Sequence, residues 1–170
     1  MKNETKGIAP LIIAVVVIVV AACVGVGAYV VVTRGGGGGG GGGDIGSATS
    51  MSCKVDATYQ GTTMTFDLKA KNLQNTANLM MRMEGTVSGQ SVIYIINAAQ
   101  SKGWICTAGT WQELPVGDLS TYQSQFTSYQ SQLSGWTGGD YTYTDPTTGT
   151  SVRTYDIELN PSLDDSLFTH

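Results

Sequence analysis

MSCKVDATYQGTTMTFDLKAK, the stretch from residue 51 to residue 71, alternates apolar and polar side chains with a period of two. Successive side chains of a strand point to opposite faces, so the pattern predicts two half-buried β-strands. Gln60-Gly61 interrupts the alternation and predicts a tight turn between them. The alternation returns over residues 79–87 and is followed by Ser88-Gly89, which predicts a third strand and another turn. Consecutive short strands joined by glycine turns predict an antiparallel meander.

The next segment, VIYII at residues 92–96, is apolar at every position. A strand that is apolar on both faces is typical of the middle of a sheet covered on both sides, so we expect this strand to be central. Residues 104–107 and Trp111, on either side of an Ala108-Gly109 turn, predict a further hairpin.

A different period appears after residue 117, where apolar residues are spaced by three and four positions. They are Leu119, Tyr122, Phe126, Tyr129 and Leu133. This spacing places them on one face of a helix, which we expect over residues 118–134 and packed against the sheet. Asp118 can cap the beginning of this helix and Gly135 can end it. Two later alternating runs, residues 141–143 and 152–159, predict the remaining strands.

The first 49 residues predict a membrane anchor and a flexible tether. Residues 8–32 carry no charge. As a helix rising about 1.5 Å per residue they would reach roughly 37 Å, enough to cross a hydrocarbon core of about 30 Å. Lys2 and Lys6 precede this segment and favour a cytoplasmic N-terminus. We therefore expect a single-pass protein of the cell membrane. Its parts are a cytoplasmic head (1–7), a transmembrane helix (8–32), a Gly-rich tether (33–49) and an extracytoplasmic β-rich domain (50–170).

Other interpretations of the N-terminal segment stay open. A cleaved secretory signal is one, although the apolar run is longer than the usual 7–15 residues. Val20-Ala21-Ala22-Cys23 fits a bacterial lipobox and would lead to lipidation. Lys6-Gly7-Ile8-Ala9 resembles the cleavage site of archaeal type IV prepilins, which implies cleavage between Gly7 and Ile8 and an archaeal membrane or surface protein. In a pilin-like subunit, the apolar helix would associate with copies of itself.

Two cysteines fall within residues 50–170, Cys53 and Cys106. Because we expect this part of the chain outside the cytoplasm, where oxidation is permitted, we predict a disulfide between them. The bridge would close a loop of about 53 residues and contribute roughly 4 kcal/mol on the chain-entropy model. Two buried free thiols are the alternative.

The composition argues against several classes of function. Charged residues make up 13% of the chain and the net charge is −4, so the surface does not attract nucleic acid. The single histidine is His170, the last residue, which removes His-based catalytic triads and most acid–base schemes. No Gly-x-Ser-x-Gly motif and no calcium-loop spacing of carboxylates is present. We therefore expect a protein that is not an enzyme and that has no cofactor and no metal site.

The succession Val92-Ile93-Tyr94-Ile95-Ile96, Lys102-Gly103-Trp104-Ile105-Cys106 and Gly109-Thr110-Trp111, with a tail from Pro161 to Phe168, resembles the lipoprotein-carrier (LolA-like) superfamily. The resemblance covers residues 50–168. It implies an α+β domain: a strongly curved antiparallel sheet, or open half-barrel, with one helix on its concave face. Members of the superfamily carry or sense lipids and acylated chains outside the cytoplasmic membrane. The chain departs from their pattern in having no helix before the first strand.

These observations give two hypotheses of function. The first is a tethered, non-enzymatic module that binds a lipid or an acylated ligand under the helix. Its lining residues would be Met64, Phe66, Met81, Met83, Tyr94, Ile96 and Trp104, with Tyr122, Phe126 and Tyr129 from the helix. The same residues can instead simply fill a core. The second hypothesis is an archaeal pilin-like structural subunit or surface protein.

Overall fold

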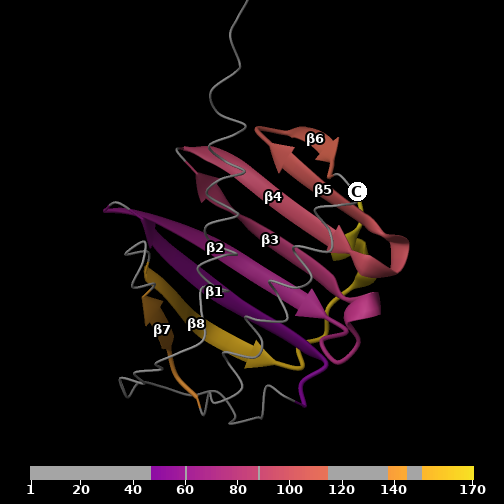
Figure 1. Ribbon diagram of the computed structural model, residues 1–170, viewed down its shortest axis with the longest axis horizontal. Helices are drawn as coiled ribbons and strands as arrows, with labels where there is room; N and C mark the ends of the chain where they lie inside the picture. The colour runs from indigo at the N-terminus through magenta and orange to yellow at the C-terminus, as the bar shows by residue number, and fades with distance from the viewer. Residues whose placement is uncertain (1–46, 60, 88, 115–137, 145–150) are drawn as a thin grey trace, which may run out of the picture.

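The computed structural model describes residues 47–59, 61–87, 89–114, 138–144 and 151–170. These residues form one eight-stranded antiparallel sheet with the strand order β6-β5-β4-β3-β2-β1-β8-β7 (Figure 1). The strands are β1 (Ser50–Tyr59), β2 (Thr62–Lys71), β3 (Met80–Val87), β4 (Gln90–Asn97), β5 (Lys102–Thr107), β6 (Thr110–Glu113), β7 (Tyr141–Thr144) and β8 (Ser151–Leu159). Short 3-10 turns lie at η1 (Thr76–Asn78), η2 (Ala98–Gln100) and η4 (Asp165–Phe168).

The first six strands form the predicted meander, and each pairs with the strand before it in the chain. The register carries the apolar alternation straight across the sheet. Leu68 of β2 lies opposite Met83 of β3, and Met83 lies opposite Tyr94 of β4. Strand β8 returns to the free side of β1, where Val55 lies opposite Thr154. The strand positions predicted from the alternation are confirmed, and β4 is central as expected.

A bulge in β8 keeps its apolar residues on one face. The pairing of β8 with β1 shifts between Ser52 and Lys54, and Asp156 takes up the extra residue with φ 52°. An extra residue in one strand changes which face the following side chains occupy. Val152 before the bulge and Leu159 after it therefore both contact the same core.

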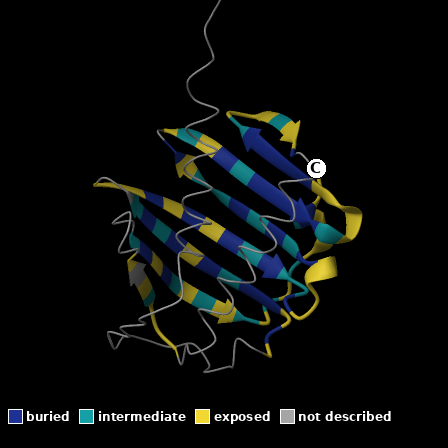
Figure 2. Ribbon diagram, viewed as in Figure 1, coloured by how far each residue is buried: buried dark blue, intermediate teal, exposed yellow. Residues whose placement is uncertain are grey.

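The face of the sheet that contains this core, called here the apolar face, holds the larger hydrophobic cluster. Its buried side chains come from strands β1 to β4 and from β5 and β8, and the alternation of buried and exposed positions is visible along the strands (Figure 2). No helix or strand among the described residues packs across this face as a second layer. The apolar face nevertheless consists of buried side chains, with Met51, Ala57 and Val92 at 0% exposure.

The opposite face is divided into a polar half and an apolar half. The apolar half lies over β3 to β6 and is covered by residues 161–170, a segment called here the strap (Figure 1). Phe168 of the strap and Ile95 of β4 are both fully buried there, with Trp104 of β5 at 8% exposure. This packing explains why β4 is apolar on both sides.

Two predictions about the fold class are overturned. The α+β class is wrong for the described residues, which form an antiparallel sheet and 3-10 turns without an α-helix. The single-pass membrane location is also contradicted, because the described part of the chain contains no helix long and apolar enough to cross a membrane. The segments in which we predicted the transmembrane helix and the packed helix, residues 8–32 and 118–134, lie outside the described residues.

The predicted disulfide is wrong. Cys53 and Cys106 are both buried and form no disulfide. Cys53 shares a cross-strand row with Leu68, Met83, Tyr94 and Ile105 on the apolar face. Cys106, the next residue after Ile105, therefore faces the other way. Strands β1 and β5 are also four spacings of about 4.8 Å apart, whereas a disulfide needs Cα atoms within about 7 Å.

Candidate functional site

The candidate site is the apolar face of the sheet, which the strand register assembles from widely separated parts of the chain. In one row Met51 of β1 lies opposite Ala70, Ala70 opposite Met81, and Met81 opposite Ile96. The small Ala70 thus lies between two long methionine side chains in this row. Because the strands are antiparallel and in register, the row runs across the strands, near the end of the sheet where β1 and β3 begin and β2 and β4 end.

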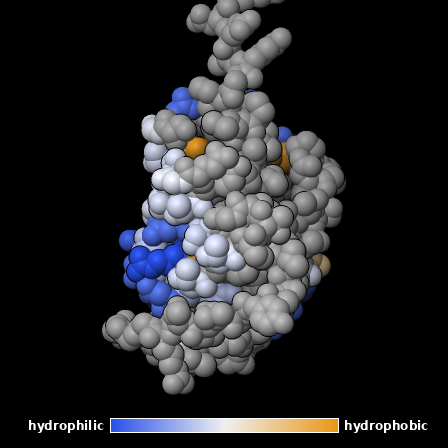
Figure 3. All heavy atoms as spheres, turned by 60° about the vertical axis from the view of Figure 1, so that its left-hand side comes forward, coloured by the Kyte–Doolittle hydropathy of each residue, from blue (hydrophilic) through white to orange (hydrophobic). Residues whose placement is uncertain are grey.

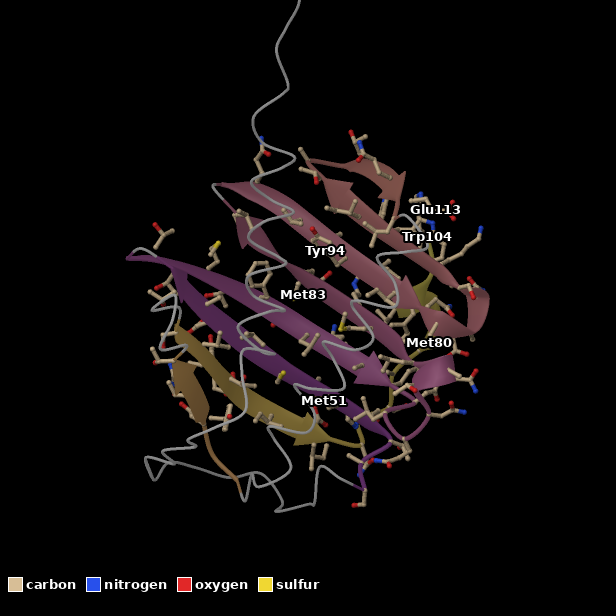
Figure 4. The ribbon with its side chains drawn as sticks, viewed as in Figure 1. Met51, Met80, Met83, Tyr94, Trp104 and Glu113 are labelled. Atoms are coloured by element: carbon tan, nitrogen blue, oxygen red, sulfur yellow. The ribbon has the colours of Figure 1, made fainter. Side chains whose placement is uncertain are left out.

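Methionine is the distinctive residue of this face. Met51, Met64, Met81 and Met83 come from three neighbouring strands and are all buried in the same cluster. Met51, Met83 and Tyr94 spread over the face turned toward the viewer in Figure 4. A methionine side chain is unbranched and polarisable, so it adapts to irregular apolar shapes. A surface with four methionines can therefore repack around a partner more easily than the same surface with leucine or isoleucine at these positions.

The structure places most of the predicted lining residues together. Met64, Phe66, Met81, Met83, Tyr94 and Ile96 all lie in the one cluster on the apolar face. Trp104 does not, since it lies opposite Ile95 and packs with the strap on the other face. Tyr122, Phe126 and Tyr129 lie outside the described residues, as does the predicted processing site at Gly7 and Ile8.

The polar half of the opposite face is organised by ion pairs at the β1, β7 and β8 edge. Arg153 Nε donates to Asp140 Oδ2 at 2.9 Å, and Arg153 Nη1 lies 3.9 Å from Asp56 Oδ2. The Arg153 guanidinium lies 4.5 Å from the centre of the Tyr155 ring, within the range of a cation–π contact. The hydrogen bond to Asp140 raises the pKa of Arg153. Partial burial and the neighbouring Asp56 carboxylate raise the pKa of Tyr155.

Hydrophilic side chains gather along one side of the view in Figure 3. Two further ion pairs on this face, Lys54 with Asp156 at 3.7 Å in the polar half and Arg82 with Glu84 at 2.8 Å on β3, involve partly exposed side chains. Surface pairs of this kind contribute little to stability. Charges of both signs alternate here, so the polar half does not offer a single-sign surface to a charged partner.

The strap is the feature that sequence reasoning missed. Leu163, Leu167 and Phe168 of this segment pack into the second hydrophobic cluster. His170 lies two residues after Phe168. It is exposed, but its ring stacks on Trp111 with centroids 4.2 Å apart and meets Trp104 edge-on at 6.5 Å. The apolar residues of the strap were the available signal, but nothing local in the sequence identifies which face they cover.

The described residues offer little for acid–base or metal chemistry. Within them, no three His, Cys, Asp or Glu side chains gather closely enough to hold a metal ion. Three groups have a shifted pKa: Arg153, Tyr155 and Asp164. Each takes part in surface contacts that hold β7, β8 or the strap. That the protein is not an enzyme stays a prediction.

Comparison with known proteins gives no further guide to the site: no protein-family model, curated protein or solved structure matches the chain.

Proposed function

We propose that residues 50–170 form a non-enzymatic binding module that holds a hydrophobic ligand, such as a lipid or an acylated chain, against the apolar face of the sheet. The proposal rests on one observation, the presence of four methionines, Met51, Met64, Met81 and Met83, in the one buried cluster on that face. It agrees with the resemblance of residues 50–168 to the lipoprotein-carrier superfamily.

The layering of the sheet supports this proposal. A sheet with one strongly apolar face must bury that face against something else, usually another layer of the protein. The described residues supply a cover for the opposite face, the strap, but no second layer for the apolar face. The side chains of this face are buried, so in the proposed complex an apolar ligand replaces contacts that now cover them.

The chemistry of the face supports an apolar ligand in particular. Tyr94 is the one aromatic hydroxyl among its fully or nearly fully buried residues in the described chain, and the other members are hydrocarbon or sulfur side chains. Burial of apolar area contributes about 25 cal/mol per Å². Such a surface gives affinity to a chain-like apolar molecule without requiring directional hydrogen bonds.

The test is to compare methionines on the two faces. Met81→Leu/Met83→Leu keeps the apolar face hydrophobic and close to its volume, so we expect a stability loss below about 1.5 kcal/mol. Met80→Leu is the matched control, because Met80 precedes Met81 in β3 but packs on the opposite face. Binding of a fluorescent fatty acid to the protein is measured for each, after extraction of any lipid carried through purification.

If the proposal is right, the double variant binds the fatty acid several-fold more weakly, and Met80→Leu binds it as the wild type does. Native mass spectrometry of the wild type should also show a bound lipid before extraction. Equal affinity in all three proteins, with no lipid found by mass spectrometry, would mean that the methionines only fill a core.

A further inference from the structure

The strap runs across the strands and contacts β1 to β6 in order. Pro161 O accepts a hydrogen bond from Ser50 Oγ of β1 at 2.8 Å. Further along, Lys71 of β2 bonds to Leu163 O and to the Asp165 carboxylate. The next contacts come from Arg82 of β3 and Asn97 of β4, whose side chains donate to Leu167 O at 3.1 Å and Phe168 O at 3.4 Å. His170 then reaches Trp104 of β5 and Trp111 of β6.

These contacts are of a kind that recognises a short linear segment. Side chains of the sheet donate to main-chain carbonyls of the strap, which any sequence would present. Three apolar side chains, Leu163, Leu167 and Phe168, provide the selectivity by packing on Ile95 and its neighbours. Met80, Trp104 and Glu113 lie on the side of the sheet where the strap runs (Figure 4). The surface under the strap is called here the strap groove. It is complementary to a segment with the pattern Leu-x-x-x-Leu-Phe.

The strap can leave without disturbing the β-sheet ladder. Its hydrogen bonds to the groove come from side chains rather than from strand pairing. It is joined to β8 through Asn160, which has φ 58°, and Pro161, a pair that turns the chain out of the sheet. Asn160 stays anchored by Thr49 N–H, which donates to Asn160 Oδ1 at 2.8 Å, and the ring of Pro161 fixes its φ angle. Rotation about the ψ angles of these two residues redirects the whole strap, as at a hinge between a domain and an exchanged element.

The groove is poorly suited to remaining empty. Opening the strap would expose Phe168 and Ile95, both at 0% exposure, together with Trp104. An occupant with the same pattern would bury them again. The strap also carries two carboxylates, Asp164 and Asp165. The groove contributes the cation Lys71, which forms an ion pair with Asp165. The most complementary occupant that the structure identifies is therefore another strap of the same sequence.

We propose that the strap groove is an interaction surface for a second copy of this chain, and that two copies exchange their straps to form a symmetric dimer. In this dimer each strap lies in the partner's groove and makes the contacts that it makes within its own chain. Exchange of an identical element costs no contacts, and only the hinge changes conformation. The site lies on the opposite face from the proposed ligand site, so this inference does not depend on that function.

Charge reversal at one contact gives a direct test on the full chain. Lys71→Glu places a carboxylate against Asp165, and Asp165→Lys places an ammonium group against Lys71. Each variant alone therefore weakens the seating of its own strap. In a mixture of the two, a strap-exchanged heterodimer pairs opposite charges in both grooves. We expect the heterodimer to exceed either homodimer by about five-fold or more, because two contacts are repaired at once.

The measurement is native mass spectrometry of isotopically distinguished chains, mixed at high concentration in mild urea and then returned to buffer. The double variant Lys71→Glu/Asp165→Lys repairs the contact within one chain and should behave as the wild type does. The pair Lys54→Glu and Asp156→Lys is the matched control, because it reverses an ion pair on the same face that does not involve the strap. That mixture should show the two-fold ratio of heterodimer to either homodimer that random pairing gives, and no more.

Either of two results would overturn the proposal. The first is that all proteins are monomers at every concentration after the urea step, which would mean that the strap does not exchange. The second is that dimers form without an excess of the Lys71→Glu and Asp165→Lys heterodimer over the random ratio, or with the same excess in the control pair. Association would then run through another part of the chain.

Discussion

The Phe66 ring of β2 lies directly over Gly85 of β3, in the space that a side chain at residue 85 would occupy. The two residues are opposite one another in the sheet, and a Cβ atom built on Gly85 would come within 2.6 Å of Phe66 Cδ1. The same atom would also collide with the main-chain carbonyl oxygen of Thr65. Glycine is therefore required here by the close approach of an aromatic ring and a neighbouring strand, which is a known use of glycine within strands.

We predict that Gly85→Ala destabilises the sheet by about 1–3 kcal/mol, the usual cost of adding a methyl group where no space exists. Urea unfolding followed by far-UV circular dichroism measures the loss. The double variant Phe66→Leu/Gly85→Ala should recover only part of it, since the collision with Thr65 O involves the main chain. An alanine variant as stable as the wild type would show that β2 and β3 can move apart.

The second prediction concerns the packing of the strap. Phe168→Ala removes a fully buried ring that contacts Ile95 and Trp104, so we expect a loss of about 3–5 kcal/mol in the free energy of unfolding. Thr169→Ala, next to it but exposed, is the control and should change stability by less than about 0.5 kcal/mol. Urea titration compares the two. Equal, small losses in both variants would mean that the ring is not packed as described.

The third prediction concerns the edge strand β7. Arg153 links Asp140, which precedes β7, to β8 and β1 through its bonds to two carboxylates. Removing the guanidinium in Arg153→Ala should speed amide hydrogen exchange in residues 141–144 without changing exchange in β3 and β4. Arg153→Lys keeps the charge but loses the forked geometry and should give an intermediate rate. Unchanged exchange at β7 in the alanine variant would show that strand pairing alone holds the edge.

The fourth prediction is a pH dependence of the strap. Asp164 caps η4, where the Ser166 hydroxyl and then the Ser166 N–H, at 2.8 Å, lower the pKa of its carboxyl group below the ordinary value of 3.8. A pKa that is lower in the folded state stabilises the fold above the unfolded-state pKa, and this contribution is lost as the pH falls through the folded-state pKa. The strap should therefore loosen as the pH is lowered below 3.8.

Fluorescence of Trp104 and Trp111, which lie against His170, measures that loosening in a Trp136→Phe background. Asp164→Asn should remove part of the acid-dependent change, because asparagine keeps the cap without the titration. Asp67→Asn, an exposed position on β2, is the control and should titrate as the parent protein does. An identical acid transition in Asp164→Asn and the parent would contradict the assignment.

The fifth prediction concerns the two thiols. Because Cys53 and Cys106 lie on opposite faces of the sheet, peptide mapping of protein alkylated in denaturant without reductant should find both residues modified. Addition of a reductant should leave the urea midpoint unchanged. A disulfide-linked peptide containing both residues in freshly purified protein would contradict the strand order β1 to β5.

The strands could be predicted from the sequence because their signal is local. Alternation over residues 51–71 and 79–87 places every second side chain on one face, whichever strands lie next to it. The same alternation correctly grouped Met64, Phe66, Met81 and Met83 as one apolar surface. The apolar run at residues 92–96 indicated cover on both faces, and Phe168 on Ile95 supplies the cover on one of them.

The wrong predictions for Trp104 and Cys106 depend on which face of the sheet a side chain occupies relative to side chains of distant strands. The sequence predicts that Trp104 lines the apolar face and that Cys106 pairs with Cys53, but the face that each residue occupies is set by the register of β5 on β4. A shift of one residue in that register would move every side chain of β5 to the other face. Nothing near residues 104–106 in the sequence specifies it.

The sequence by itself determined which segments are strands, that one face of the sheet is apolar and rich in methionine, and that β4 is buried on both sides. These properties follow from side-chain periodicity, which acts between neighbouring residues. The tertiary structure alone decided that β8 pairs with β1, that the two cysteines are kept apart and that the strap crosses six strands. These depend on contacts between residues as far apart as Thr49 and Asn160, where the pairing reflects the packing of the whole sheet rather than any local preference.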